Sequence, residues 1–398
     1  MTIRDRWLLP EGIEETLPSE ARRLEALRRR VLDLFDSWGY ELVMPPLLEY
    51  LDALLTGVGH ELDLQTFKVI DQLSGRLMGV RADITPQAAR IDAHYLKRPH
   101  ATRLCYVGPV LRTRPEELAG SREPLQVGAE LFGHRGPESD AEVLSLMLAM
   151  LALTGIERPH VDLAHVGVFA ALVERAGLDV AQREELLEAI ERRSRSDVEA
   201  LLAACSVASG SRREILALLE LSGDEEVLAR ARQEYRTIDG ALAAIDDLES
   251  IARQVRAQAP EVALHFDLAE LGGYQYYTGV KFFAFVPGEG RAVAKGGRYD
   301  GIGRAFGRDR AATGFSADLR RLADLGALDI PARPAILAPA GDDPALLAEI
   351  ARLRASGERV LRRLPGDDAT AEALGCDREL VEQGGRWQVR AAGAPGKS

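Results

Sequence analysis

The stretch that decides the expected fold runs from Leu104 to Gly133 and reads LCYVGPVLRTRPEELAGSREPLQVGAELFG. An apolar segment stands at each end, and a polar loop rich in charged residues separates the two, which predicts two strands joined by a loop. Just beyond, Ser139 can cap a helix that runs to about Thr154, where Gly155 ends it. This part of the chain therefore predicts strand, loop, strand and helix in succession.

The N-terminal side of this stretch adds a helix and further strands. Ser19 can cap a helix whose apolar residues recur at helical spacing until Gly39, and residues 40–46 form a short extended run ended by two prolines. Residues 67–71 and 76–80 flank a turn at 73–75, a pattern typical of a hairpin. Because the strands are grouped without regular helical crossovers, we expect a largely antiparallel sheet with helices on one side, an α+β fold.

On the C-terminal side of this stretch, the residue composition and periodicity change twice. Residues from about 168 to 256 are rich in Ala, Leu, Glu and Arg with helical periodicity, which predicts a helical insertion. Strand character returns at 264–268 and 280–286. Pro331 and Pro334 indicate a linker, so we expect a domain of residues 1–330 and a small α/β domain of residues 331–398. The latter contains one βαβ-like unit and ends in a tail, 391–398, expected to be disordered.

Composition narrows the class of protein. The 398 residues carry a formal net charge of -12, which argues against a surface that grips a long nucleic acid. The three cysteines lie far apart, and the seven histidines show no HExxH spacing, so neither a disulfide framework nor a metal site is expected. We find no signal-peptide pattern and no membrane-spanning segment, and expect a cytoplasmic protein.

Five short motifs follow one another along the chain: residues 39–45 (GYELVMP), 81–86 (RADITP), 108–133 (from GPVLR to ELFG), 274–279 (YQYYTG) and 296–315 (from GGRYDG to GF). In residues and order they resemble the motifs of class II aminoacyl-tRNA synthetases, and of histidyl-tRNA synthetase in particular. The resemblance covers residues 8–325. It implies the class II synthetase fold, with its antiparallel sheet and flanking helices.

The residue types in these motifs suit a free histidine. Such a ligand needs carboxylates for its ammonium, a cation for its carboxylate and polar partners for its imidazole. The resemblance implies a histidine-binding set around the amino group, the backbone and the ring: Asp83, Thr85, Arg112, Gln126, Glu130, Tyr276 and Tyr277. A structural alternative stays open, in which Asp83 caps the helix from Pro86 and the tyrosines belong to the core.

The same motifs depart from the synthetase pattern where ATP would bind. The transition-state arginine of the synthetases aligns with Gly272, the adenine-facing glutamate with Arg114, and a glycine under the nucleotide with Asp318. The loop at 115–120 lacks the expected basic residues. Since activation of an amino acid with ATP requires positive charge on the phosphates, we expect no catalytic residues and no cofactor.

A retained histidine pocket beside eroded ATP and tRNA functions resembles the regulatory subunits of ATP phosphoribosyltransferase, which are synthetase paralogues. The resemblance implies a self-dimer that joins a short-form catalytic subunit in a hetero-oligomer, a hetero-octamer, with L-histidine as feedback effector and no tRNA. Two alternatives remain, a divergent histidyl-tRNA synthetase and a tRNA-binding sensor module. The effector could occupy either the old substrate pocket or a subunit interface.

Overall fold

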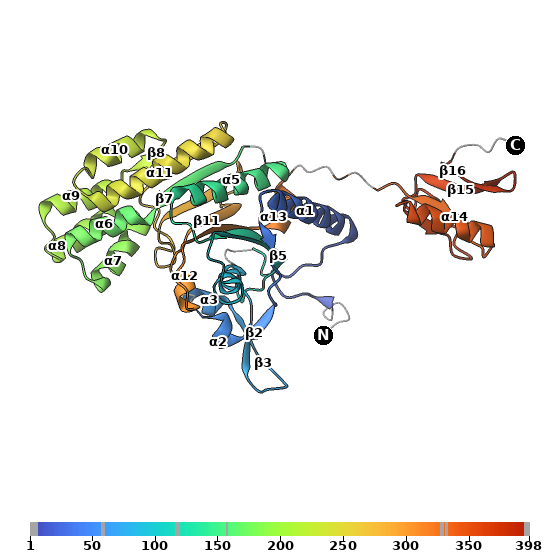
Figure 1. Cartoon of the computed structure of the whole chain (residues 1–398), viewed down its shortest axis with the longest axis horizontal. Coiled ribbons are helices and arrows are strands. Elements are labelled where there is room, and N and C mark those ends of the chain that lie inside the picture. The colour runs from blue at the N-terminus through green and yellow to red at the C-terminus, as the bar shows by residue number, and fades with distance from the viewer. Residues whose placement is uncertain are drawn as a thin grey trace. The chain divides into compact units, whose positions relative to one another are not determined.

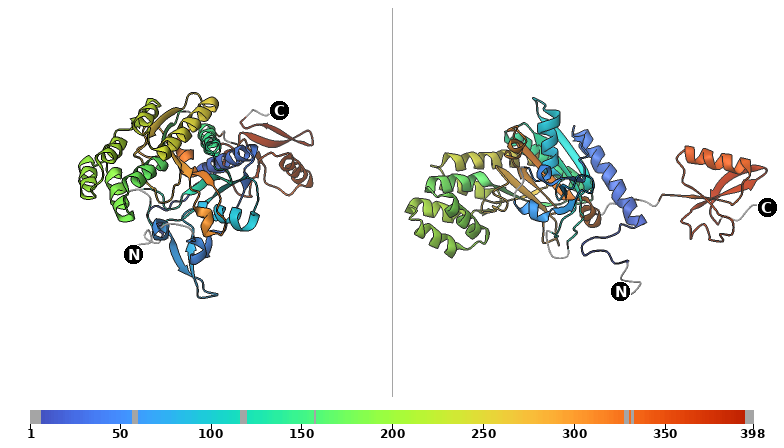
Figure 2. Two further views of the ribbon diagram at one scale, coloured as in Figure 1. Left: turned by 60° about the vertical axis from the view of Figure 1, so that its left-hand side comes forward. Right: turned by 90° about the horizontal axis from the view of Figure 1, so that it is seen from below.

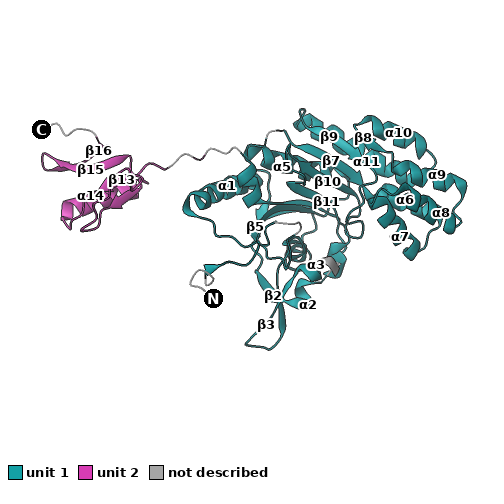
Figure 3. Ribbon diagram, turned by 180° about the vertical axis from the view of Figure 1, so that it is seen from behind, with its two compact units in different colours: residues 1–328 teal, residues 329–398 magenta. Residues whose placement is uncertain are grey.

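The structure is a computed structural model that describes residues 7–56, 60–115, 120–156, 158–326, 330 and 333–393, with the side chains of 60 and 61 left out. The chain divides into two compact units, Met1–Leu328 and Asp329–Ser398, which Figure 3 colours separately. No helix in the described ranges has the length and apolarity needed to cross a bilayer.

A nine-stranded sheet forms the centre of the first unit. Its spatial order is β1-β5-β6-β12-β11-β10-β7-β9-β8. The strands are β1 (Glu41–Leu42), β5 (Thr102–Pro109), β6 (Leu125–Phe132), β7 (His160–His165), β8 (Ser222–Gly223), β9 (Ala263–Asp267), β10 (Val280–Phe285), β11 (Ala294–Arg298) and β12 (Ala312–Asp318). Neighbours run antiparallel except for the β1–β5 and β7–β9 pairs. The largely antiparallel sheet expected from the sequence is thus confirmed.

Helices cover one face of this sheet, as Figure 1 shows. They are α1 (Pro18–Ser37), α5 (Pro137–Leu153), α11 (Asp239–Gln258) and α13 (Leu319–Leu325). From α1, Phe35 packs edge-on against Phe315 of β12, with 6.0 Å between ring centroids. Because side chains alternate along a strand, Gly314 and Ser316 face the opposite side of the sheet, where a site can form.

The serine caps expected for two of these helices are wrong. The structure starts α1 at Pro18 and α5 at Pro137, and neither Ser19 nor Ser139 supplies a cap. Proline is well suited to the first helical turn because the N–H it lacks has no partner there. Ser139 lies inside α5, where its hydroxyl donates to the Gly136 carbonyl at 2.9 Å.

A three-stranded sheet with short helices lies on the other side of the large sheet (Figure 1). Its strands are β2 (Leu48–Tyr50), β3 (Phe67–Ile70) and β4 (Leu77–Val80), and the helical segments are α2 (Leu51–Leu54), α3 (His60–Gln65), α4 (Thr85–Arg90), η2 (Ile91–Leu96) and α12 (Ile302–Ala305). The β3–β4 pair is antiparallel and confirms the predicted hairpin. The chain passes from β4 through residues 81–84 into α4, which brings this connection beside β5 and β6.

The predicted helical insertion gathers at one end of the large sheet (Figures 1 and 2). It comprises α6 (Val166–Ala176), α7 (Val180–Glu191), α8 (Arg195–Ala204), α9 (Ser209–Leu218), α10 (Glu226–Glu234) and α11. Its helical character is confirmed. The insertion also contains β8, a strand that was not predicted. It is only two residues long and pairs with β9 at the edge of the large sheet.

The second unit holds a four-stranded sheet of order β14-β13-β15-β16. The predicted βαβ-like unit is confirmed as β13 (Ile336–Ala338), α14 (Pro344–Ala355) and β14 (Val360–Arg362). The expectation of a single such unit missed a hairpin, β15 (Arg378–Gln383) and β16 (Arg386–Ala391), joined at Gly384–Gly385, both at positive φ. Ala391 therefore ends a strand, while residues 394–398 of the predicted disordered tail lie outside the described residues.

Candidate functional site

A buried carboxylate forms the floor of the site. Glu130 projects from β6 with 1% of its surface exposed. The Tyr106 hydroxyl donates to its Oε1 at 2.8 Å, and the Tyr299 hydroxyl donates to its Oε2. Burial raises the pKa of Glu130 to about 8, although both tyrosine hydrogen bonds lower it. No cation is among these contacts, so the carboxyl is held by neutral donors only.

A glycine on the adjacent strand makes room for this carboxylate. Gly314 of β12 pairs directly with Glu130 across the ladder. A Cβ at position 314 would lie 1.5 Å from Glu130 Oε2, closer than any non-bonded approach allows. Of the ordinary residues, only glycine therefore permits the observed placement of the carboxylate at this register position.

The second carboxylate comes from the connection between β4 and α4. Asp83 Oδ1 accepts a hydrogen bond from Gln126 Nε2 at 2.7 Å and another from the Thr85 backbone N–H at 3.0 Å. Gln126 also accepts from the Ile84 N–H at 2.9 Å, so it ties this connection to β6. Asp83 thus bonds the first residue of α4, but Ile84 holds the N-cap position and α4 has no side-chain cap. The structural alternative, in which Asp83 caps this helix, is therefore wrong, and Asp83 lines the cavity described below.

Three tyrosine rings form the wall. Tyr276 stacks on Tyr299, with ring centroids 5.3 Å apart and planes at 16°, and meets Tyr277 edge-on at 5.1 Å. Tyr276 remains 37% exposed, so it is not a core residue. Gly297 and Arg298 belong to β11. That strand places Tyr299 over Glu130.

These residues surround a cavity of about 70 Å³, here called the tyrosine cavity. Its lining includes five of the seven predicted histidine-binding residues, Asp83, Thr85, Glu130, Tyr276 and Tyr277. Gln126 and Arg112 line a neighbouring cavity of about 420 Å³, here called the large cavity. The two cavities share Lys295 and Ser316 in their linings and are therefore adjacent.

The large cavity holds one of the positions at which the sequence departs from the synthetase pattern. Asp318 lines it, but its Oδ1 accepts from the backbone N–H groups of Leu125 and Arg320 at 3.1 and 3.0 Å, which caps α13. Arg321 donates to the Glu289 carboxylate at 2.7 Å and to the Ala292 carbonyl at 3.0 Å. These charges are thus engaged within the protein.

Two other departures fall elsewhere. Arg114 is exposed and lines a separate surface pocket with Glu11 and Glu14. Of the loop at 115–120, residues 116–119 lie outside the described residues.

A lysine lies beside Gly272, the position of the expected arginine. Lys281 of β10 is fully buried, and its ammonium donates to the Glu270 carboxylate at 3.1 Å and to the Gly272 carbonyl. The ammonium also lies 5.5 Å from the centre of the Tyr277 ring. Burial lowers the pKa of Lys281, and Glu270 opposes that shift. The cation is thus placed behind the tyrosine wall.

Sequence reasoning missed three residues of this site: Tyr106, Tyr299 and Lys281. Tyr299 stood in a motif that had been singled out, and its glycine-rich surroundings signalled a close approach of backbone. Tyr106 and Lys281 carried no such signal, since each reads as an ordinary strand residue whose role depends on its partner across the sheet.

Comparisons with known proteins find the same two kinds of relative, histidyl-tRNA synthetases and ATP phosphoribosyltransferase regulatory subunits. The histidyl-tRNA synthetase family profile matches residues 12–322, and that of the "ATP phosphoribosyltransferase subunit HisZ C-terminal domain" matches residues 333–390. An ATP phosphoribosyltransferase regulatory subunit from Alkalilimnicola ehrlichii is 53% identical over 390 residues, 97% of each chain. A solved structure titled as an ATP phosphoribosyltransferase regulatory subunit/histidyl-tRNA synthetase, from Bacillus halodurans, is 27% identical, with a TM-score of 0.80, over 94% of this chain and 97% of that one. Histidyl-tRNA synthetase from Nostoc shares the fold at 20% identity, with a TM-score of 0.76, over 94% of this chain and 91% of that one.

Proposed function

Because the chain belongs to the family of ATP phosphoribosyltransferase regulatory subunits, we propose that its tyrosine cavity binds L-histidine as the feedback effector of that enzyme. The family assigns the chain a non-catalytic role in the first step of histidine biosynthesis. The single observation that carries the proposal is the pair of carboxylates, Asp83 and Glu130, that line one cavity with the tyrosines.

The pocket suits the ligand group by group. An ammonium between Asp83 and Glu130 would make charge-assisted hydrogen bonds, which are stronger than neutral ones. Tyr276 and Tyr277 offer ring faces and hydroxyls to an imidazole. Because the tyrosine cavity of about 70 Å³ adjoins the large cavity, the ligand's carboxylate would extend toward the side where Arg112 lies.

Feedback inhibition requires a coupling free energy between histidine binding and the activity of the assembly. Histidine regulates only if it binds unequally to the active and the inhibited assembly. The pocket is formed by residues of the large sheet, from β6, β11 and β12, and by the connection from β4 into α4. A ligand there would therefore contact the large sheet and this connection at once, which supports a shift of the connection against the sheet on binding.

The absence of synthetase catalysis is a further part of the proposal. Gly272 cannot supply the charge of an arginine, and Arg321 is paired with Glu289 in the structure. Asp318 brings a carboxylate into the lining of the large cavity, where an anionic nucleotide would have to bind. We expect no aminoacyl-adenylate to form.

The partner would be a short-form catalytic subunit, joined by dimers of this chain in a hetero-octamer without tRNA. Self-association through residues 40–46 is supported by β1, the edge strand of the large sheet, and by exposed apolar side chains next to it. Leu42, Met44 and Leu47 are 42%, 78% and 45% exposed. Exposed apolar edges of this kind are typical of association surfaces. Sedimentation that shows only monomer at micromolar concentration would contradict this part.

The deciding experiment is reconstitution with a purified short-form ATP phosphoribosyltransferase. We expect the two chains to co-purify, activity to depend on this chain, and histidine to inhibit the complex. Glu130→Gln should shift inhibition to at least tenfold higher histidine while uninhibited activity stays near normal. Glu184→Gln, on the exposed surface of α7, is the matched control.

Two outcomes would contradict separate parts of the proposal. Failure to assemble or to support activity would refute the partnership itself. Assembly with normal histidine binding by the Glu130→Gln variant, measured by calorimetry, would place the effector site at a subunit interface instead of in the tyrosine cavity.

A further inference from the structure

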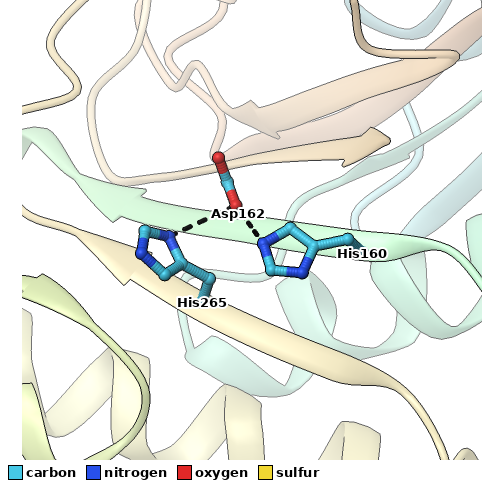
Figure 4. Close-up of side chains that lie close together, drawn as sticks. All are labelled: His160, Asp162 and His265. Atoms are coloured by element: carbon cyan, nitrogen blue, oxygen red, sulfur yellow. Dashed lines mark ion pairs between the residues drawn. The ribbon is translucent and has the colours of Figure 1, made fainter. Parts of the chain in front are cut away.

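Two histidines and an aspartate lie together on two strands of the large sheet, as Figure 4 shows. His160 and Asp162 belong to β7, and His265 lies on the parallel strand β9, directly opposite Asp162. Because side chains two residues apart in a strand share a face, the register alone brings the three together. Asp162 also lines the large cavity.

The two distances from Asp162 to the histidines in this cluster match those between ligands of one metal ion. His160 Nε2 lies 2.9 Å and His265 Nδ1 3.3 Å from the same oxygen, Asp162 Oδ1. All three ligand atoms lie within 4.8 Å of one another. Two ligands at zinc bonding distance, with angles of about 90–110°, are themselves about 2.9–3.4 Å apart. The cluster is thus close to the arrangement that an ion would require.

The hydrogen bonding of the cluster is incomplete. Asp162 Oδ1 and His265 Nδ1 are shielded from solvent, and the ion-pair contacts described above are their contacts within the cluster; neither atom has a partner with hydrogen-bond geometry in the part of the chain that the structure describes. Buried polar atoms normally have such partners, and a bound ion is one explanation when they do not.

A neighbouring hydroxyl fixes the orientation of one ring. Ser222 Oγ lies 3.3 Å from His265 Nε2, the ring nitrogen that faces away from Asp162. Histidines that bind metals commonly bond their second ring nitrogen to such a partner, which fixes the tautomer and leaves the other nitrogen as ligand. Ser222 lies on β8, so the helical insertion supplies this contact.

We propose that His160, Asp162 and His265 bind a divalent transition-metal ion of the zinc type. Two imidazoles and one carboxylate suit zinc and its neighbours better than magnesium or calcium, which prefer oxygen ligands. Three protein ligands leave at least one position for water or an anion. The ion would lie at the margin of the large cavity and is independent of histidine binding.

The test is calorimetric titration of the full chain with zinc chloride. We expect one ion per chain, and an affinity at least tenfold lower in each of His160→Ala, Asp162→Asn and His265→Ala. Ser222→Ala should cause a smaller loss, because water can replace an exposed hydroxyl. His94→Ala, which removes an exposed histidine outside the cluster, is the control and should bind as the parent chain does.

A second measurement guards against misfolded variants. Zinc should raise the melting temperature of the parent chain and of His94→Ala, because a ligand that binds only the folded state stabilises it. It should not do so for a variant lacking both His160 and His265. Absence of stoichiometric zinc binding at micromolar concentration by the parent chain, or unchanged affinity in the double variant, overturns the proposal.

Discussion

The tyrosine cavity and the large cavity lie side by side, yet their charged groups are satisfied in different ways. In the first, Glu130 is held by two tyrosine hydroxyls without a cation. In the second, Arg321 is paired with Glu289, and Asp318 accepts two backbone N–H groups. Glu130, as a carboxylate held by neutral donors, still gains from a ligand's ammonium, whereas Arg321 must lose Glu289 before it gains an anionic partner. The difference favours the tyrosine cavity over the large cavity as the place where a cationic group of a ligand would bind.

The largest expected effect concerns the pH dependence of stability in Glu130→Gln. The folded chain keeps a proton on Glu130 up to a pKa of about 8, against 4.5 for the unperturbed group, so raising the pH across this window favours unfolding. One pKa unit corresponds to about 1.4 kcal/mol. The free energy of unfolding of the parent chain should therefore fall by several kcal/mol across this window, whereas that of the variant should not. Urea denaturation at both ends of the window measures this. Equal pH profiles for the parent and the variant would break the contrast between the cavities.

A somewhat smaller effect is expected for Gly314→Ala. The new Cβ would occupy the position of Glu130 Oε2, which displaces the carboxylate from the tyrosine cavity. Loss of a charge-assisted contact costs up to about 3 kcal/mol, or roughly a hundredfold in histidine affinity. Calorimetry of the folded variant measures the loss. Gly301→Ala, with no atom within 4 Å of the added Cβ, should bind histidine normally, and a similar loss there would show that the effect is not local.

Asp83→Asn sharpens the comparison at the level of a single charge. The amide keeps an acceptor for Gln126 but removes the charge facing the ligand, so histidine affinity should fall tenfold or more, equivalent to about 1.5–3 kcal/mol. Asp318→Asn makes the same change in the large cavity and should leave histidine affinity unaltered. If both variants weaken histidine binding equally, the two cavities act as one site.

The smallest effect is expected for Gly272→Arg, which should gain no synthetase activity. The variant has a positive charge at position 272, but Arg321 stays paired with Glu289 and Asp318 stays in the lining of the large cavity. Histidine-dependent pyrophosphate exchange should remain at background in both the parent chain and the variant. A signal in the unmodified protein would contradict the proposed loss of catalysis.

The sequence predicted the elements whose pattern is local. The β3–β4 hairpin and the helices of the insertion follow from alternation and helical spacing within a few residues. The β15–β16 hairpin was not predicted, because most of its residues are Arg, Glu and Gln. Leu380 is its only buried residue among those described. A small, polar strand pair has no apolar pattern to detect.

The candidate site divides in the same manner. Asp83, Glu130 and the tyrosine pair stood in recognisable motifs, and the structure brings them around one cavity. Contacts across the sheet could not be predicted, because they depend on strand register. Pairing of Gly314 with Glu130, and of Asp162 with His265, joins residues more than a hundred positions apart. Periodicity along the chain contains no information about such partners.

The contact between Lys281 and Gly272 limits which side chains position 272 can accept. An ideal Cβ at position 272 lies 4.0 Å from the Lys281 ammonium and 3.1 Å from Glu270 Oε1. An arginine introduced at 272 would enter beside an existing cation that is already bound to the nearest carboxylate, so the two positive charges would repel each other. A cation at position 272 is therefore disfavoured unless position 281 changes as well, so we expect only one of the two positions to carry a positive charge at a time.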